Sequence, residues 1–360
     1  IRDRLKPNVG RISRQGLIPI SHSQDTPGPL TRNVADALIL LEVLEGKDPQ
    51  DPATSLARGK SEIPEFHIQS DRLEGIRIGV ARNLYHGDSR MEQLLEDAVR
   101  ALIDLGAVVK DSLYLDNTML LKMPELEVLL HEFKLGINAY LGNLEDHPEH
   151  PSPPKSLKEL ITFNQAHQEQ VMPFFAQELF EKAERRGDLS SEIHLESLKE
   201  CRRLSRQQGI DAFMQKHGLD AFIAPTSGPA WLTDSVNGDP VSIETSFTPS
   251  AVAGYPGISV PLGFISGLPV GLSFYGGAWS ERMLLRCAHA FENATKAQIA
   301  PEISYHETID SKAWKILWRF GKRKKKTGKE FSDSSVKSSQ RVRPMPSTVM
   351  PERRNSNISG

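Results

Sequence analysis

The segment from Gly10 to Arg32 limits what this chain can fold into. It contains three glycines, three prolines and three serines within 23 residues. Proline removes a backbone donor and interrupts helices, whereas glycine favours turns. The next segment, 34–44, is an almost continuous apolar run, and Gly46 stands where a helix would end. The sequence therefore predicts a long connection with short extended runs, such as 16–20, that leads directly into a helix over 34–44.

Two segments farther along predict strands with a helix between them. Residues 76–81 alternate in the manner of a buried strand, and 107–110 begin a second β-rich run. Between them, apolar residues recur at helical spacing over 91–105, and Gly106 ends the pattern. A strand, a helix and a strand in this order are typical of a βαβ unit in an α/β protein.

Three more strands and one more helix are predicted after residue 210. The strands are expected over 219–225, 258–261 and 270–275, each bounded by glycine or proline. The helix is expected over 280–291, with Ser280 as its N-cap residue.

The chain is predicted to divide into a main domain over 1–310 and a tail over 311–360. The domain includes a charged, helix-rich excursion at about 120–210, which we expect to cover one side of the core. The tail carries a net charge of +11 and the remaining residues −13, although the whole chain has a net charge of only −2. The Ser, Arg and Pro content of the tail predicts disorder.

The first part of the tail, 313–326, combines two tryptophans and a phenylalanine with a run of lysine and arginine. Three interpretations remain open. The segment makes weak contact with a membrane surface, where each basic residue contributes about 1 kcal/mol, or it is a nuclear localisation signal, or it is a solvated tail. Nucleic acid is not an expected partner, because the main domain is acidic.

The composition is that of a globular protein, with 38% hydrophobic and 25% charged residues. No apolar window of about 18 residues occurs, so no transmembrane helix is predicted. Cys201 and Cys287 lie far apart in the sequence, which fits a reducing compartment and favours the cytoplasm. Histidine and cysteine show no metal-ligand spacing, and no phosphate-binding loop occurs, so the sequence predicts no metal or nucleotide site.

Four ordered blocks of the sequence resemble the amidase signature family. The first block contains five motif residues for which we expect structural roles: Lys6, Pro7, Gly10, Arg32 and Asp36. The other three blocks span 224–231, 247–263 and 267–274. Together the blocks cover most of the main domain, and they are most similar to the peptide amidase branch of the family.

The resemblance implies a three-layer α/β/α fold with a large mixed sheet. It also implies hydrolysis of a small-molecule or peptide amide through a Ser-Ser-Lys triad and an acyl-enzyme, without a metal or organic cofactor. In the family, the three catalytic residues lie upstream of the pair that Lys6 and Pro7 match. We therefore expect this chain, which starts at Ile1, to lack the triad and part of the sheet, and we predict no catalytic residue within it.

Two roles for the chain remain open from the sequence. In the first, it is part of a full-length amidase that hydrolyses carboxamide bonds. In the second, it is a non-catalytic interaction protein, in which an amidase-like scaffold carries the basic tail to a membrane or to the nucleus.

Five residues are candidates for a substrate cleft. Thr226 and Ser227 follow a predicted strand, and open α/β sheets bind ligands at strand ends; a capped turn is the alternative interpretation. Tyr255, between two glycines and before a proline, belongs either to a tight turn or to the cleft. Gln24 and Asp25 either support the architecture of the loop or contact the substrate.

Local contacts are expected to organise the loop that holds Gln24 and Asp25. Ser21 and His22 are adjacent, and neighbours in an extended segment point to opposite faces, so we expect loop hydrogen bonding here and not a nucleophile–base pair. Arg32 is expected to pair with Asp36 or with Asp25.

Overall fold

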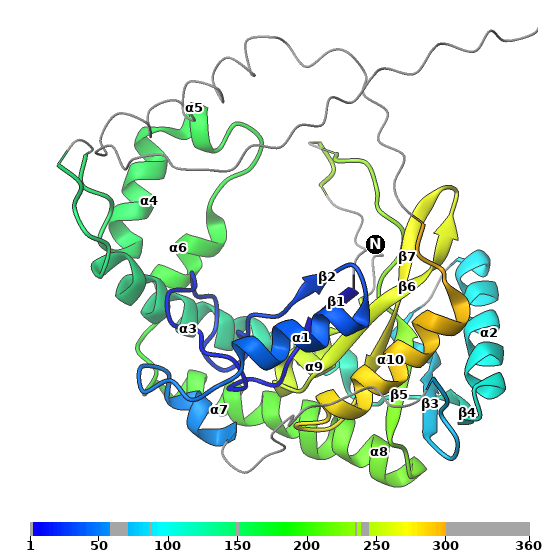
Figure 1. Cartoon of the computed structure of the whole chain (residues 1–360). Helices are drawn as coiled ribbons and strands as arrows, with labels where there is room; N and C mark the ends of the chain where they lie inside the picture. The colour runs from blue at the N-terminus through cyan, green and yellow to red at the C-terminus, as the bar shows by residue number, and fades with distance from the viewer. Residues whose placement is uncertain are drawn as a thin grey trace, which may run out of the picture. The chain divides into compact units, whose positions relative to one another are not determined.

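A computed structural model gives the fold of the chain (Figure 1). The residues that it describes are 3–57, 71–85, 88–148, 151–234, 236–238 and 245–299. The predicted tail, 311–360, lies outside the described residues, and so does the segment 313–326 within it. None of the described helices is long and apolar enough to cross a membrane.

A seven-stranded mixed sheet is the centre of the described structure, with strand order β2-β1-β6-β7-β5-β3-β4. The strands are β1 (Asp3–Lys6), β2 (Leu30–Thr31), β3 (Arg77–Ala81), β4 (Val108–Leu113), β5 (Ala221–Pro225), β6 (Gly257–Ile265) and β7 (Leu268–Tyr275). Strand β3 runs parallel to both β4 and β5, and the other pairs are antiparallel. The predicted mixed sheet is therefore confirmed.

Helices cover both faces of the sheet. On the first face, α1 (Val34–Leu44), α2 (Ser89–Asp104) and α10 (Glu281–Thr295) pack on alternate strand residues such as Ile258 and Phe274 in the main hydrophobic core. On the second face, α8 (Asp211–His217) packs on Phe222 and Tyr275 in a smaller core. The strands alternate apolar residues between the two faces. This gives the three α/β/α layers that the resemblance implied.

The predicted βαβ unit is present. Strands β3 and β4 are parallel neighbours, and α2 connects them. Asp88 caps the helix, because its side chain accepts a hydrogen bond from the N–H of Arg90. Gly106 follows the helix with φ +94°, a conformation that strongly favours glycine.

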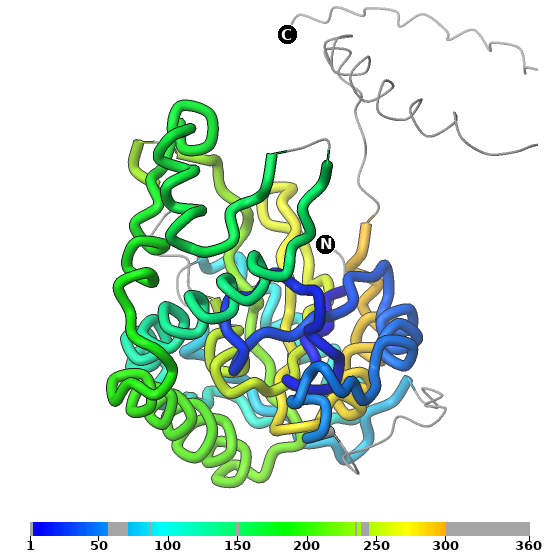
Figure 2. Tube along the Cα trace, turned by 90° about the vertical axis from the view of Figure 1, so that its left-hand side faces the viewer, coloured from blue at the N-terminus to red at the C-terminus, as the bar shows by residue number. Residues whose placement is uncertain are grey.

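A helical region fills the sequence between β4 and β5. It contains α3 (Lys122–Gly142), α4 (Leu157–Ala166), α5 (Gln168–Val171), α6 (Glu178–Glu184) and α7 (Glu192–Arg202). Figure 2 shows these helices in green, on one side of the sheet. Residues of α3, α4 and α6 form a separate hydrophobic cluster that includes Leu130, Leu157 and Ala183. The region therefore has a core of its own.

The structure differs from the sequence predictions in three local details. Strand β1 was not predicted from the sequence, since its partner β6 is about 250 residues away along the chain. The segment 16–20 forms no strand. Ser280 precedes α10, but its hydroxyl donates to the carbonyl of Gly277, 2.7 Å away, and does not cap the helix.

The beginning of α1 also differs from expectation. The Oδ1 atom of Asn33 accepts a 2.7 Å hydrogen bond from the N–H of Asp36 and thereby caps the helix. The carboxylate of Asp36 accepts a hydrogen bond from the side-chain amide of Asn33 and does not contact Arg32. The side chains of Arg32 and Asp36 are both exposed. Among the described residues, Arg32 pairs neither with Asp36, whose place is taken by the capping residue, nor with Asp25, the other partner that was expected.

Candidate substrate cleft

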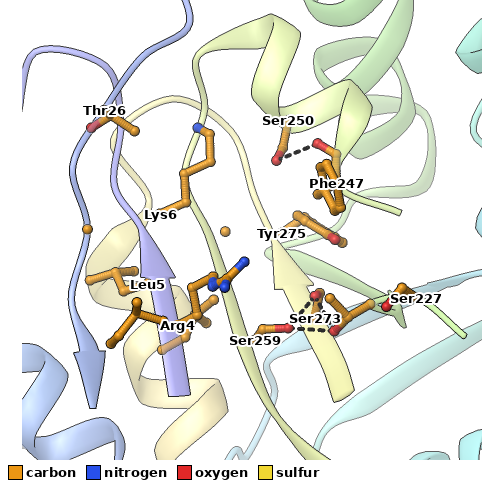
Figure 3. Close-up of a pocket in the computed structure, with 15 residues that line it drawn as sticks. Arg4, Leu5, Lys6, Thr26, Ser227, Phe247, Ser250, Ser259, Ser273 and Tyr275 are labelled. Carbon is orange, nitrogen blue, oxygen red and sulfur yellow. Dashed lines mark hydrogen bonds between the residues drawn. The ribbon is translucent and has the colours of Figure 1, made fainter. Parts of the chain in front are cut away.

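A cavity of about 400 Å³ lies over the second face of β1, β6 and β7 (Figure 3). Its wall includes Thr226 and Ser227, two of the residues that were candidates for a substrate cleft, and both directly follow β5. The other lining residues are Arg4, Leu5, Lys6, Thr26, Gly28, Leu30, Phe247, Ser250, Gly257, Ile258, Ser259, Ser273 and Tyr275.

Strand register explains why polar side chains meet in this cavity. Arg4 on β1 pairs with Ser259 on β6, and Ser259 pairs with Ser273 on β7. Paired residues of antiparallel strands project from the same face of a sheet, so the three form one polar row. In the next row, Lys6 pairs with Gly257. The missing side chain at Gly257 leaves space beside Lys6.

Three hydroxyl groups form a closed cluster in the cavity. Thr226 Oγ1 lies 2.5 Å from Ser259 Oγ and 2.8 Å from Ser273 Oγ, and the two serine oxygens are 2.9 Å apart. Gly271 makes this cluster possible, because a Cβ atom at that position would lie 2.8 Å from Thr226 Oγ1. Since hydroxyl groups rotate, the cluster can present either a donor or an acceptor to a ligand.

Lys6 brings a perturbed amine to the cavity. Its Nζ atom donates a 2.6 Å hydrogen bond to the carbonyl of Tyr255. Burial lowers the pKa of Lys6 to about 8, and the charge of Glu281 opposes the shift. At pH 7 the amine is still mainly protonated. Lys6, predicted as a structural residue, thus both lines the cavity and holds the loop before β6.

Tyr275 closes one side of the cavity from β7. Its hydroxyl lies 2.6 Å from Ser246 Oγ, and burial raises the pKa of Tyr275 to about 12. The phenol therefore stays neutral at physiological pH and acts as a hydrogen-bonding group.

Tyr255 is buried beside the cavity and is not part of its lining. Its hydroxyl donates to Asp211 Oδ2 over 3.1 Å, and the guanidinium of Arg206 stands 5.6 Å from the ring centre. Burial, together with Asp211, raises the pKa of Tyr255 to about 12. The residue reaches the cavity only through its carbonyl, which accepts the bond from Lys6.

Asp25 and Gln24 organise the loop that leads to the cavity. The Oδ2 atom of Asp25 accepts hydrogen bonds from the N–H groups of Ile20 and Ser21, both 2.8 Å long. Burial raises the pKa of Asp25, although these two bonds oppose the shift. The N–H of Gln24 donates to the carbonyl of Ser21. Neither side chain is part of the cavity lining.

Two other residues of this loop, Thr26 and Gly28, line the cavity instead. Gly28 approaches β1 so closely that a Cβ atom would lie 2.0 Å from the carbonyl oxygen of Leu5. The glycine–proline spacing of the loop was the available signal for this contact, but neither residue was predicted from the sequence.

The remaining motif residues lie outside the cavity lining. Pro7 is buried directly after β1, and Gly10 has φ +90° with the backbone of Ala53 against it. Arg32 and Asp36 are exposed at the start of α1.

A second polar cluster surrounds the buried carboxylate of Glu132 on α3. Its Oε2 atom accepts hydrogen bonds from the hydroxyls of Ser21 and Ser23. Its Oε1 atom lies 3.4 Å from His194 Nε2 and 3.5 Å from His22 Nε2. The Ser21 hydroxyl thus donates to a carboxylate and not to His22, so loop hydrogen bonding is the role that the structure supports for this pair.

Among the described residues, no group of three or more His, Cys, Asp or Glu side chains could hold a metal ion.

Residues 5–285 match the family model described as Amidase. The chain belongs to the amidase family. This confirms the resemblance that the four sequence blocks carried.

Three relatives show the extent of the similarity. A probable amidase of Arabidopsis thaliana is 34% identical over 309 residues, which are 83% of this chain and 54% of that protein. The native peptide amidase of Stenotrophomonas maltophilia is 40% identical, with a TM-score of 0.75, over 84% of this chain and 60% of that one. An amidase family protein of Bacillus anthracis is 27% identical, with a TM-score of 0.68, over 84% of this chain and 55% of that one. The chain thus spans little more than half the length of these relatives.

Proposed function

We propose that this chain is the substrate-binding part of an amidase that hydrolyses the carboxamide bond of a small-molecule or peptide amide. The observation that carries the proposal is the 40% identity with a peptide amidase over 84% of the chain. The match to the amidase family over residues 5–285 supports the same reaction class.

The mechanism that we propose for the whole protein is the Ser-Ser-Lys acyl-enzyme route. A serine hydroxyl adds to the amide carbonyl, its proton passes through the second serine to a neutral lysine, and ammonia or an amine leaves. Water then cleaves the acyl-enzyme and releases a carboxylate. We propose that the three residues lie in sequence upstream of Ile1.

The cavity over β1, β6 and β7 is the proposed place for the non-reacting part of the substrate. Its hydroxyl cluster can hydrogen-bond an amide, and Phe247 and Leu30 supply apolar surface. Pockets with a mainly apolar wall and a few convergent polar groups are typical of small-molecule sites. The proposal therefore assigns Thr226 and Ser273 to substrate binding.

Ammonia release from N-acetylphenylalaninamide tests the proposal. Residues 1–360 alone should release none, whereas the protein extended to its natural first residue should release ammonia in proportion to time and enzyme. In the extended protein, Thr226→Val should lower kcat/KM about tenfold, because one hydrogen bond is lost. Thr162→Val, at an exposed position on α4, is the matched control and should leave kcat/KM unchanged.

Two results would contradict the proposal. One is an extended protein that hydrolyses no amide in a panel of peptide, aryl and alkyl amides. The other is full activity of residues 1–360, which would contradict the proposed position of the triad.

A further inference from the structure

The cavity over β1, β6 and β7 carries positive charge that its own lining does not neutralise. Arg4 and Lys6 both line it, and none of the other lining residues that the structure describes is aspartate or glutamate. Within the described part of the chain, no hydrogen bond or ion pair engages the Arg4 guanidinium. A guanidinium at the edge of a cavity with no protein partner can bind an anion without first breaking an ion pair.

The position of Arg4 is set by the sheet. Its register partner Ser259 and the next residue across, Ser273, stand in the same row. Figure 3 shows the Arg4 guanidinium on the same side of the sheet as the hydroxyls of these two serines. The row therefore places the Arg4 guanidinium on the same face of the sheet as rotatable hydroxyls, and both kinds of group can donate to a ligand.

The shape of this donor set favours a carboxylate. A guanidinium offers two parallel N–H groups that match the two oxygens of a planar carboxylate. The side chains of Leu30 and Phe247 supply apolar surface in the cavity, and they suit the carbon skeleton of an organic acid better than a fully hydrated inorganic anion.

We propose that the cavity binds a carboxylate group of its ligand, with the Arg4 guanidinium as the main donor and the hydroxyls of Ser259 and Ser273 as further donors. This proposal deepens the proposed function, since it rests on the cavity being the substrate cleft. The carboxylate has two possible sources. It belongs either to a substrate that carries an acid group besides its amide or to the acid that hydrolysis produces.

Isothermal titration calorimetry on residues 1–360 at pH 7 and low salt tests the proposal without any need for turnover. The probes are succinamate, which has one amide and one carboxylate, succinamide, which is neutral, succinate and inorganic sulfate. Succinamate should bind at least about tenfold more tightly than succinamide, because a hydrogen bond to a charged group contributes more than a neutral one. The preference should weaken as salt is added.

Variants of Arg4 connect the preference to one side chain. Arg4→Gln should remove the difference between succinamate and succinamide, and Arg4→Lys, which keeps the charge but loses the planar fork, should restore part of it. Arg100→Gln is the matched control, because it removes an exposed guanidinium on α2 that pairs with the neighbouring Asp97. It should leave the preference intact. Far-UV circular dichroism confirms that each variant is folded.

Equal affinities for succinamate and succinamide would overturn the proposal, and so would a preference that survives Arg4→Gln. Sulfate binding as tight as that of succinamate would exclude a carboxylate-specific site, and no binding by any probe would exclude the site altogether. If succinate binds more tightly than succinamate, the site holds the product, and the reverse order assigns it to the substrate. Failure of amide hydrolysis, measured separately as ammonia release, would leave these binding results standing.

Discussion

Arg11 and Glu281 form a two-pronged ion pair between the segment after β1 and the first residue of α10. Arg11 Nε lies 2.7 Å from Glu281 Oε1, and Nη2 lies 3.0 Å from Oε2. The side chains are 3% and 0% exposed, and Oε1 also accepts a 2.8 Å bond from the N–H of Asn8. This buried ion pair therefore links the segment after β1 to helix α10, which packs in the main core.

Arg11→Met should lower the free energy of unfolding by about 3–5 kcal/mol, because it leaves Glu281 buried without its partner. The double variant Arg11→Met with Glu281→Leu should recover much of this loss. Guanidinium chloride denaturation of the wild type, the single variant and the double variant measures the effect. The control is Arg100→Met, whose partner Asp97 is exposed, and which should cost less than about 1 kcal/mol. If Arg11→Met and Arg100→Met lose the same free energy of unfolding, the buried ion pair contributes no more to stability than the exposed one.

Glu132→Gln should destabilise the protein by about 1–3 kcal/mol at pH 7. The substitution weakens three hydrogen bonds to a buried carboxylate, which come from the hydroxyls of Ser21 and Ser23 and from the N–H of Ser23. Burial alone would raise the pKa of Glu132, but the bonds from Ser21 and Ser23 and the charge of His22 lower it below its usual value. The stabilisation is therefore present above the usual glutamate pKa and is lost as the pH falls through the lowered one. Urea unfolding should show a smaller difference between wild type and variant at pH 4 than at pH 7. The exposed Glu196→Gln on α7 is the control, and a difference that does not change with pH would contradict this account.

The free energy of unfolding should fall as the pH rises from about 4 to about 8, because the folded protein holds the carboxyl group of Asp3 in its protonated form over this range. The side chain is fully buried with no hydrogen-bond partner among the described residues for either carboxylate oxygen, and burial, followed by the nearby carboxylate of Glu292, raises the pKa of Asp3 to about 8. The folded state therefore keeps a proton that the unfolded state has already lost, so the stability that is present below pH 4 is lost as the pH approaches 8.

Asp3→Asn should remove most of this loss and be more stable than wild type at pH 8, since asparagine carries no charge to bury. Thermal unfolding across this pH range measures the slope of stability against pH. Asp116→Asn, at an exposed position, should leave the slope as it is in the wild type. Identical slopes for wild type and Asp3→Asn would refute the assignment to Asp3.

Gly10→Ala should be far more damaging than Gly16→Ala, although both glycines have positive φ, +90° and +80°. A Cβ atom at Gly10 would lie 2.3 Å from the carbonyl oxygen of Ala53, whereas nothing lies within 4 Å of one at Gly16. The Gly16 variant should lose about 1 kcal/mol from backbone strain alone, and the Gly10 variant should lose several kcal/mol because a neighbouring backbone must move. The melting temperatures of the Gly10→Ala and Gly16→Ala variants measure this difference. Similar melting temperatures would mean that the backbone around Gly10 adapts to the added methyl group.

The elements that could be predicted well from the sequence depend on local patterns. The helix 34–44 and the unit of β3, α2 and β4 follow from the periodicity of a few neighbouring residues. Strand β1 has no such signal, because Asp3–Lys6 becomes a strand only when β6 supplies its hydrogen-bond partners. Ser280 shows the limit of cap rules, since its hydroxyl finds the nearer carbonyl of Gly277.

The candidate site divides in the same way. Thr226 and Ser227 could be predicted because a strand end is visible in the sequence. Ser259, Ser273 and Arg4 could not, because only the register of three strands brings them into one row. Each of these residues alternates with buried apolar neighbours, which indicates that its strand has one polar face. The sequence does not indicate that the polar faces of the three strands lie side by side in the sheet.

The antiparallel pairing of β1 with β6 also has a consequence for biosynthesis. Lys6 cannot meet Gly257 until the ribosome has added some 250 further residues, which takes roughly 10–50 s at usual elongation rates. Of the described partners of β1, only the two residues of β2 are available during that time, and its apolar Leu5 lacks β6 and β7, which complete its core. We therefore expect nascent chains of this protein to depend on chaperones that hold an early strand, and slower translation of the helical region should lengthen that dependence.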